Sequence, residues 1–125
     1  MLEWRNKYGP HKLRIKDLKW PEESIVIQHG FDLQGHPIVW MLVDNNEKIP
    51  KNEENIKERI KTVIYCYEKA IAQMKKPIYN LTLIIDFKGG TLNIPQVKQF
   101  KGIFEELGLN YAERIHKIFI LNAPW

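Results

Sequence analysis

The chain has 125 residues, 44% hydrophobic and 27% charged, which fits one globular domain rather than a disordered or fibrous protein. No apolar run approaches the roughly 20 residues of a membrane-spanning helix, and the first residues lack the pattern of a secretion signal. The single cysteine, Cys66, falls within a helical pattern and cannot form an internal disulfide. We therefore expect a cytoplasmic protein.

The net charge of +4 comes entirely from residues 1–20, which carry six basic and two acidic side chains, whereas the remainder carries thirteen of each. Three aromatic residues are interleaved with these charges: Trp4, Tyr8 and Trp20. Such a mixture suits an anionic lipid surface or a nucleic-acid backbone. A solvated, partly helical arm with its tryptophans packed on the domain is the third explanation and the favoured one. Nucleic acid is the least favoured of the three explanations.

Trp20-Pro21 separates this arm from the domain, because a residue before proline is disfavoured in a helix. We predict an arm over residues 1–20 and a domain over residues 21–125. Ile25–His29 and Pro37–Val43 are rich in β-branched and aromatic residues and predict two strands. The Asp32–Gly35 segment between them suits a type I turn, so the pair predicts a hairpin.

Asn52 is placed to cap a long helix, whose apolar residues recur at steps of three and four as far as Met74. Pro77 ends it. The Asn80–Phe87 segment is nearly continuous in apolar residues, which is typical of a parallel strand buried on both faces.

A second helix has Pro95 in its first turn and Gly108 as its expected C-terminal stop. Its predicted inward face consists of Val97, Phe100, Phe104 and Leu107. A last strand follows at about His116–Leu121. Strands joined by helices imply right-handed crossovers, so the expected class is α/β: a mixed sheet with an N-terminal hairpin and parallel strands.

Five segments, in this order and spacing, resemble parts of a known family: Leu2–Arg5, Asp32–Ile38, Ile85–Gly89, Tyr111–Ile115 and Leu121–Trp125. Together they resemble the CRAL-TRIO (SEC-fourteen-like) lipid-binding domain. The last two segments are similar to its Tyr-Pro-Glu-Arg-Leu turn and its Asn-Ala-Pro strand end. The resemblance covers the N-terminal part of that domain and the end of the helical region before it.

The chain departs from the family pattern in two ways. Ala112 replaces the proline that usually follows the tyrosine, which loosens the turn. Family members also continue past this motif into a gating helix and further pocket-forming segments, so the resemblance implies a C-terminally truncated fold. Because an apolar face without its gate is a liability, we expect self-association or low independent stability.

The resemblance implies helices on one sheet face and a large apolar cavity over the other. Such a cavity binds one hydrophobic ligand, such as a phosphoinositide, phosphatidylcholine, a tocopherol or a retinoid. We therefore expect binding, with transfer or presentation, of a phospholipid or other hydrophobic ligand, and transient membrane contact through the basic arm. The alternative is a protein-interaction module for a small GTPase or a regulatory partner. No cofactor is expected.

The candidate ligand contacts are Tyr65, Tyr67, Ile84, Asp86, Thr91 and Asn93. The two tyrosines lie on the long helix, and Thr91 with Asn93 follows the double glycine, where polar groups could meet a headgroup. Core packing and helix capping are competing explanations for these four. Strand alternation leaves open whether Ile84 and Asp86, or instead Leu83 and Ile85, face the cavity.

No catalytic set emerges. Asp86 ends a parallel strand, where α/β ligands bind, but such an aspartate also fixes the following turn, and we expect Arg114 to anchor the chain through a carboxylate or a carbonyl. No nucleophile elbow or phosphate loop is present, so neither a hydrolase nor another enzyme is expected. The histidines lie at no metal-ligand spacing, so no metal is expected: His11, His29, His36 and His116.

Overall fold

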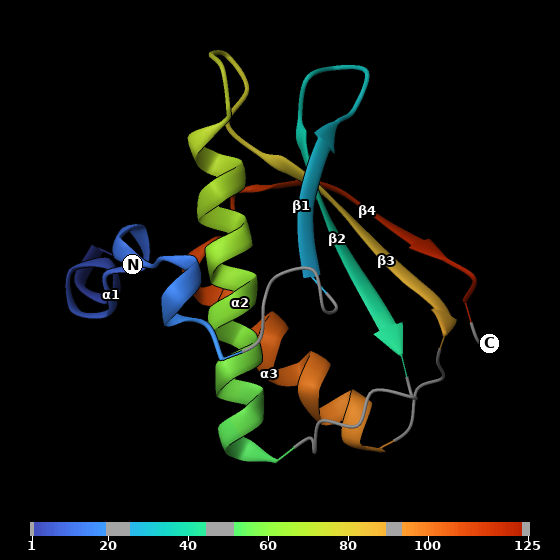
Figure 1. The fold of residues 1–125 in the computed structure, drawn as a ribbon. Coiled ribbons are helices and arrows are strands. Elements are labelled where there is room, and N and C mark those ends of the chain that lie inside the picture. The colour runs from blue at the N-terminus through green and yellow to red at the C-terminus, as the bar shows by residue number, and fades with distance from the viewer. Residues whose placement is uncertain (1, 20–25, 45–51, 90–93, 124–125) are drawn as a thin grey trace.

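The computed structural model describes residues 2–19, 26–44, 52–89 and 94–123. Helices and strands alternate along most of the chain, as the sequence predicts (Figure 1). In chain order the elements are α1 (Leu2–Tyr8), the short 3-10 turns η1 (Pro10–Lys12) and η2 (Ile15–Asp17), β1 (Val26–Phe31), β2 (Pro37–Asp44), α2 (Glu53–Ala72), β3 (Leu81–Gly89), α3 (Ile94–Asn110) and β4 (Ile115–Leu121).

The strands form one mixed sheet in the order β1-β2-β3-β4. β1 and β2 pair antiparallel as a hairpin, whereas β2 with β3 and β3 with β4 pair parallel. The two parallel connections run through α2 and α3, which lie on the same side of the sheet (Figure 1). The predicted α/β class and mixed sheet are therefore confirmed.

The hairpin turn depends on Asp32 and Gly35. The amide of Gly35 donates to the carbonyl of Asp32 at 3.0 Å, as in a type I turn. Gly35 has φ +95°, a conformation that residues with a side chain rarely adopt. The predicted turn is therefore present, and it places Asp32 and His36 side by side.

The long helix α2 begins as predicted. The side chain of Asn52 accepts a hydrogen bond from the amide of Asn55 at 2.9 Å, which satisfies one of the unpaired donors of the first turn. Glu53 and Glu54 lie in that turn, where negative charge is favoured by the helix dipole. The helix ends at Ala72, before Pro77.

The prediction for α3 was wrong in two details. The helix passes through Gly108 and ends at Asn110, whose side-chain amide donates to the carbonyl of Glu106 at 2.9 Å. Val97 is 51% exposed, whereas Ile103 is 2% exposed and faces the core. The buried positions recur every four residues, at 99, 103 and 107, and Val97 falls outside that stripe.

The hydrophobic core lies between the sheet and the two long helices. Its centre is formed by side chains with almost no exposed surface, including Val39, Leu81 and Leu83 from the sheet and Val63 and Ile64 from α2. Among the described residues, the core is therefore one-sided, with α2 and α3 on the same face of the sheet (Figure 1).

The N-terminal segment packs against the outer side of the helix layer (Figure 1). The indole Nε1 of Trp4 donates to Glu106 at 3.2 Å, and its ring meets Tyr111 edge to face at 5.7 Å. Arg5 forms an ion pair with Glu68 at 2.8 Å. Trp20 and the boundary at residues 20–21 lie outside the described residues, so the division into an arm and a domain stays a prediction.

Candidate functional site

The sheet face turned away from α2 and α3, which we call the open face, carries a continuous set of apolar side chains. In a strand, alternate residues point to opposite faces, and the pairing register brings Trp40, Ile84 and Phe119 into one row across three strands. The apolar residues of the open face are Ile27, Ile38, Trp40, Leu42, Ile84, Phe119 and Leu121.

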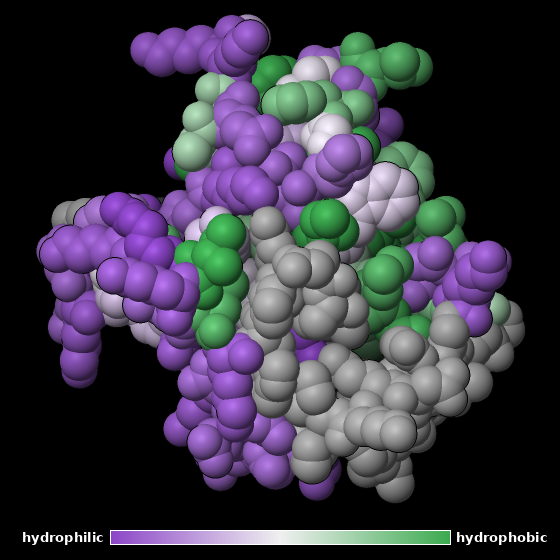
Figure 2. Space-filling model, in the orientation of Figure 1, coloured by the Kyte–Doolittle hydropathy of each residue, from purple (hydrophilic) through white to green (hydrophobic). Residues whose placement is uncertain are grey.

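Part of this apolar surface is accessible to solvent. Leu42 is 42% exposed, Phe119 48% and Leu121 41%, whereas Ile84 on the central strand β3 is half-buried. Figure 2 shows apolar side chains reaching the surface on the side of the molecule where the sheet lies. Contiguous exposed apolar surface of this kind marks a site for a ligand, a membrane or a protein partner.

The structure resolves which residues of β3 face away from the helices. Leu83 and Ile85 are buried beneath the helices, whereas Ile84 and Asp86 lie on the open face. The strand is thus fully buried on one face only. The carboxylate of Asp86 accepts from the amide of Lys88 at 2.9 Å and from the side-chain amide of Asn122 at 2.8 Å. Asp86 therefore fixes the end of β3 and joins it to the end of β4.

The other candidate contacts do not join Ile84 and Asp86. Tyr67 has no exposed surface and lies in the core on the helix side, where burial raises the pKa of its hydroxyl. Tyr65 lines a pocket of about 270 Å³ between the N-terminal segment and α2. The sheet separates both tyrosines from the open face. Thr91 and Asn93 lie outside the described residues.

A larger pocket, of about 660 Å³, also lies on the helix side, where the N-terminal segment, α2 and the turn before β4 meet. Glu68 in its wall accepts from the hydroxyl of Tyr111 at 3.1 Å and pairs with Arg5. Burial and the negative charge of Glu68 both raise the pKa of Tyr111. Because these groups satisfy one another and hold α1 against α2, we regard this pocket as structural and the open face as the functional candidate.

Arg114 has the anchoring role that the sequence predicts. Its Nη1 donates to the carbonyl of Tyr79 at 2.9 Å, and its own carbonyl accepts from the amide of Leu81 at 2.7 Å. These bonds join the turn before β4 to the start of β3. Arg114 therefore sets the position of β4 and, with it, of Phe119 on the open face.

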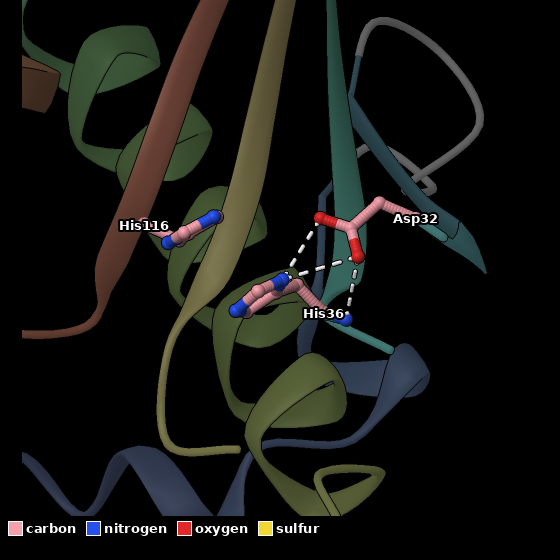
Figure 3. Close-up of side chains that lie close together, drawn as sticks. All are labelled: Asp32, His36 and His116. Carbon is pink, nitrogen blue, oxygen red and sulfur yellow. Dashed lines mark hydrogen bonds and ion pairs between the residues drawn. The ribbon is translucent and has the colours of Figure 1, made fainter. Parts of the chain in front are cut away.

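Although the histidines lie at no metal-ligand spacing in the sequence, the structure brings His36 and His116 together. Their rings stack with centroids 3.8 Å apart and planes 10° apart. Nδ1 of His36 lies 2.9 Å from Oδ2 of Asp32, and ligand atoms of all three residues lie within 4.8 Å of one another (Figure 3). The sequence contains no signal for this cluster, because His116 is eighty positions from His36 and only the sheet brings them together.

Hydrogen bonds also hold the carboxylate of Asp32. It accepts from the amides of Gln34 and His36, each at 2.9 Å, and from the hydroxyl of Thr82 at 2.9 Å. Desolvation by itself raises the pKa of Asp32, but these hydrogen bonds outweigh it and lower the pKa to about 2. Asp32 is thus a carboxylate at neutral pH.

Comparison with known proteins agrees with the fold. Residues 22–125 match the CRAL/TRIO domain family, so the chain belongs to that family. Members of this family bind and transfer lipids. The suspected resemblance is confirmed.

Several curated relatives match almost the whole chain. A CRAL-TRIO domain-containing protein of Schizosaccharomyces pombe is 25% identical over 99% of this chain and 12% of its own length. The phosphatidylinositol/phosphatidylcholine transfer protein SFH4 of Arabidopsis thaliana is 26% identical over 98% of this chain and 23% of its own length. The chain thus spans less than a quarter of either relative.

Among solved structures, the crystal structure of Sfh5 matches with a TM-score of 0.73 and 18% identity. The match covers 98% of this chain and 48% of that one, and it supports the fold alone. Within the part of the chain that the structure describes, no helix combines the length and apolar character needed to cross a bilayer.

Proposed function

We propose that this chain binds a phospholipid or another hydrophobic ligand, with the apolar part of the ligand lying on the open face. The observation that carries the proposal is the apolar row Trp40–Ile84–Phe119, which crosses the sheet on the side opposite α2 and α3. Membership of a family that binds and transfers lipids supports the same conclusion.

Such binding needs apolar area rather than chemically active groups. Each methylene of a lipid tail that leaves water contributes ~0.8 kcal/mol, so a few contacts along a chain suffice for affinity. Asp86, an acidic residue on this face, is engaged with Lys88 and Asn122. We therefore propose a binding, transfer or presentation role and no enzymatic one.

We further propose that the basic N-terminal segment gives transient contact with an anionic membrane from the cytoplasmic side. Lys7, Lys12 and Lys16 are exposed on that segment. Near an anionic surface each lysine contributes about 1 kcal/mol. We expect the Lys12→Glu/Lys16→Glu variant to float less than the wild type with phosphatidylserine vesicles. With phosphatidylcholine vesicles, the variant and the wild type should float to the same extent. Equal flotation of the wild type with both vesicle types contradicts the proposal.

The ligand proposal is tested by extracting the purified chain with organic solvent and identifying lipids by mass spectrometry, before and after incubation with mixed phospholipid vesicles. We expect one lipid per chain in the wild type and a loss of most of it in Phe119→Asp, because a charge on the open face opposes an apolar tail.

The matched control is Val97→Asp, which alters a side chain of α3 that is exposed to a similar degree but lies away from the open face. This variant should retain the lipid. Wild-type protein that carries no lipid, or a Phe119→Asp variant that keeps it, overturns the proposal. Absence of lipid in every sample would instead favour the protein-interaction alternative.

A further inference from the structure

We propose that Asp32, His36 and His116 form a binding site for a divalent transition-metal ion, and that Zn²⁺ is the ion whose chemistry fits best. The three residues come from the hairpin turn and the start of β4, and one ligand atom from each lies within 4.8 Å of the others (Figure 3). The cluster lies beyond the apolar row, at the end of the open face where Thr82 pairs with Ile38 and donates to Asp32, and the proposal does not rest on lipid binding.

The donor set selects the ion. Two imidazole nitrogens and one carboxylate oxygen are ordinary ligands of Zn²⁺. Mg²⁺ and Ca²⁺ prefer sites built from oxygen ligands, which two histidines do not provide. Three protein ligands leave the fourth tetrahedral position for water or for an anionic group of another molecule.

Neighbouring groups fix the orientation of the Asp32 carboxylate by hydrogen bonds. The hydroxyl of Thr82 donates to Oδ2 of Asp32 at 2.9 Å, and two backbone amides of the turn donate to Oδ1. Outer hydrogen bonds of this kind orient the ligands of natural metal sites. His36 is buried, so its ring has few alternative positions.

Metal binding requires only local movement. With bonds of about 2.0–2.1 Å, ligand atoms in a tetrahedral site lie about 3.3 Å apart, and the contact between Asp32 and His36 is already 2.9 Å. A metal ion must lie close to the plane of each imidazole that binds it, so the stacked ring of His116 must tilt. His116 is half-buried on the edge strand β4, where a side-chain rotation meets little resistance.

The test uses the whole chain after metal removal with EDTA, titrated with Zn²⁺ in a calorimeter and with Co²⁺ in a visible spectrometer. We expect one ion per chain, a tetrahedral Co²⁺ spectrum and a higher melting temperature with Zn²⁺, because an ion that binds only the folded chain stabilises it. His116→Ala removes a ligand and should weaken Zn²⁺ binding by at least about 100-fold. Thr82→Val removes the hydrogen bond to Asp32 and should weaken it by at least about 10-fold.

The control is His11→Ala, which removes an exposed histidine outside the cluster and should bind Zn²⁺ as the wild type does. The melting temperature of each variant in EDTA reports whether it folds. If His116→Ala fails to fold, Thr82→Val still tests the site, because valine keeps the shape of the threonine side chain. Equal Zn²⁺ affinity in wild type, His116→Ala and Thr82→Val, or an octahedral Co²⁺ spectrum, overturns the proposal.

Discussion

Two tyrosine hydroxyls on the helix side of the sheet differ in how they are satisfied. The hydroxyl of Tyr111 donates to Glu68, whereas the buried hydroxyl of Tyr67 has no hydrogen-bond partner among the described residues. A buried polar group without a partner costs stability, and a paired one contributes modestly. The two residues therefore form a matched pair for mutation.

We expect Tyr67→Phe to leave the free energy of unfolding unchanged or to raise it by up to about 1 kcal/mol, because only an unpaired hydroxyl is removed. Tyr111→Phe should lower it by about 1–2 kcal/mol, because Glu68 loses a donor. Urea denaturation at neutral pH measures both. A larger loss in Tyr67→Phe than in Tyr111→Phe contradicts this account.

The same tyrosines predict an alkaline limit to stability. Burial raises the pKa of Tyr67 in the folded chain above the ordinary value of 10.0. The pKa of Tyr67 is higher in the folded chain than in the unfolded chain. Ionisation of Tyr67 therefore leaves the free energy of unfolding unchanged below pH 10 and lowers it as the pH rises further. The Tyr67→Phe variant lacks this ionisable hydroxyl, so its melting temperature should fall less than that of the wild type above pH 10. Parallel curves for the two proteins would rule this out.

At the scale of single residues, the sequence predicted the roles that depend on local geometry. Asn52 caps its helix, Gly35 closes its turn, and Arg114 anchors the chain through a carbonyl. The placement of Tyr67 and His116 depends on distant segments, and no local pattern contains that information.

At the scale of elements, the two long helices are in tight contact at Gly102. A Cβ atom built there would lie 3.1 Å from Cγ2 of Ile56 on α2, whereas one at Gly108 would meet nothing within 4 Å. Gly102 thus allows α3 to pack against α2, and Gly108 has no such role.

We expect Gly102→Val to lower the free energy of unfolding by about 1–3 kcal/mol, because overpacking forces the helices apart. Gly108→Ala, a control substitution on the same helix, should raise it by up to about 1 kcal/mol through helix propensity alone. Chemical denaturation followed by circular dichroism compares the two. A stabilised Gly102→Val variant would show that the contact is not tight.

At the scale of the whole molecule, β4 is an edge of the described sheet and is apolar on both faces. Its exposed apolar residues are Ile118, Phe119, Ile120 and Leu121. An exposed, apolar edge strand is a template for pairing with another chain.

We therefore expect the purified chain to self-associate as its concentration rises, in sedimentation velocity measurements. Ile120→Lys should reduce the association, because a lysine on an edge strand opposes pairing. Val97→Lys, which changes an exposed residue of α3, should not. A wild-type chain that stays monomeric at every concentration would refute the expectation.

The sequence by itself determined the elements, their order and the α/β class, because hydrophobic periodicity, caps and turn residues act over a few neighbouring positions. Only the tertiary structure decided which face of β3 is open, since a shift of one residue in the strand register exchanges the two faces. It also decided that His36 stacks on His116, because their contact requires β2, β3 and β4 to align side by side. The tertiary structure likewise decided which side of α3 faces the core: the contact with α2 at Gly102 turns Ile103 inward and Val97 outward.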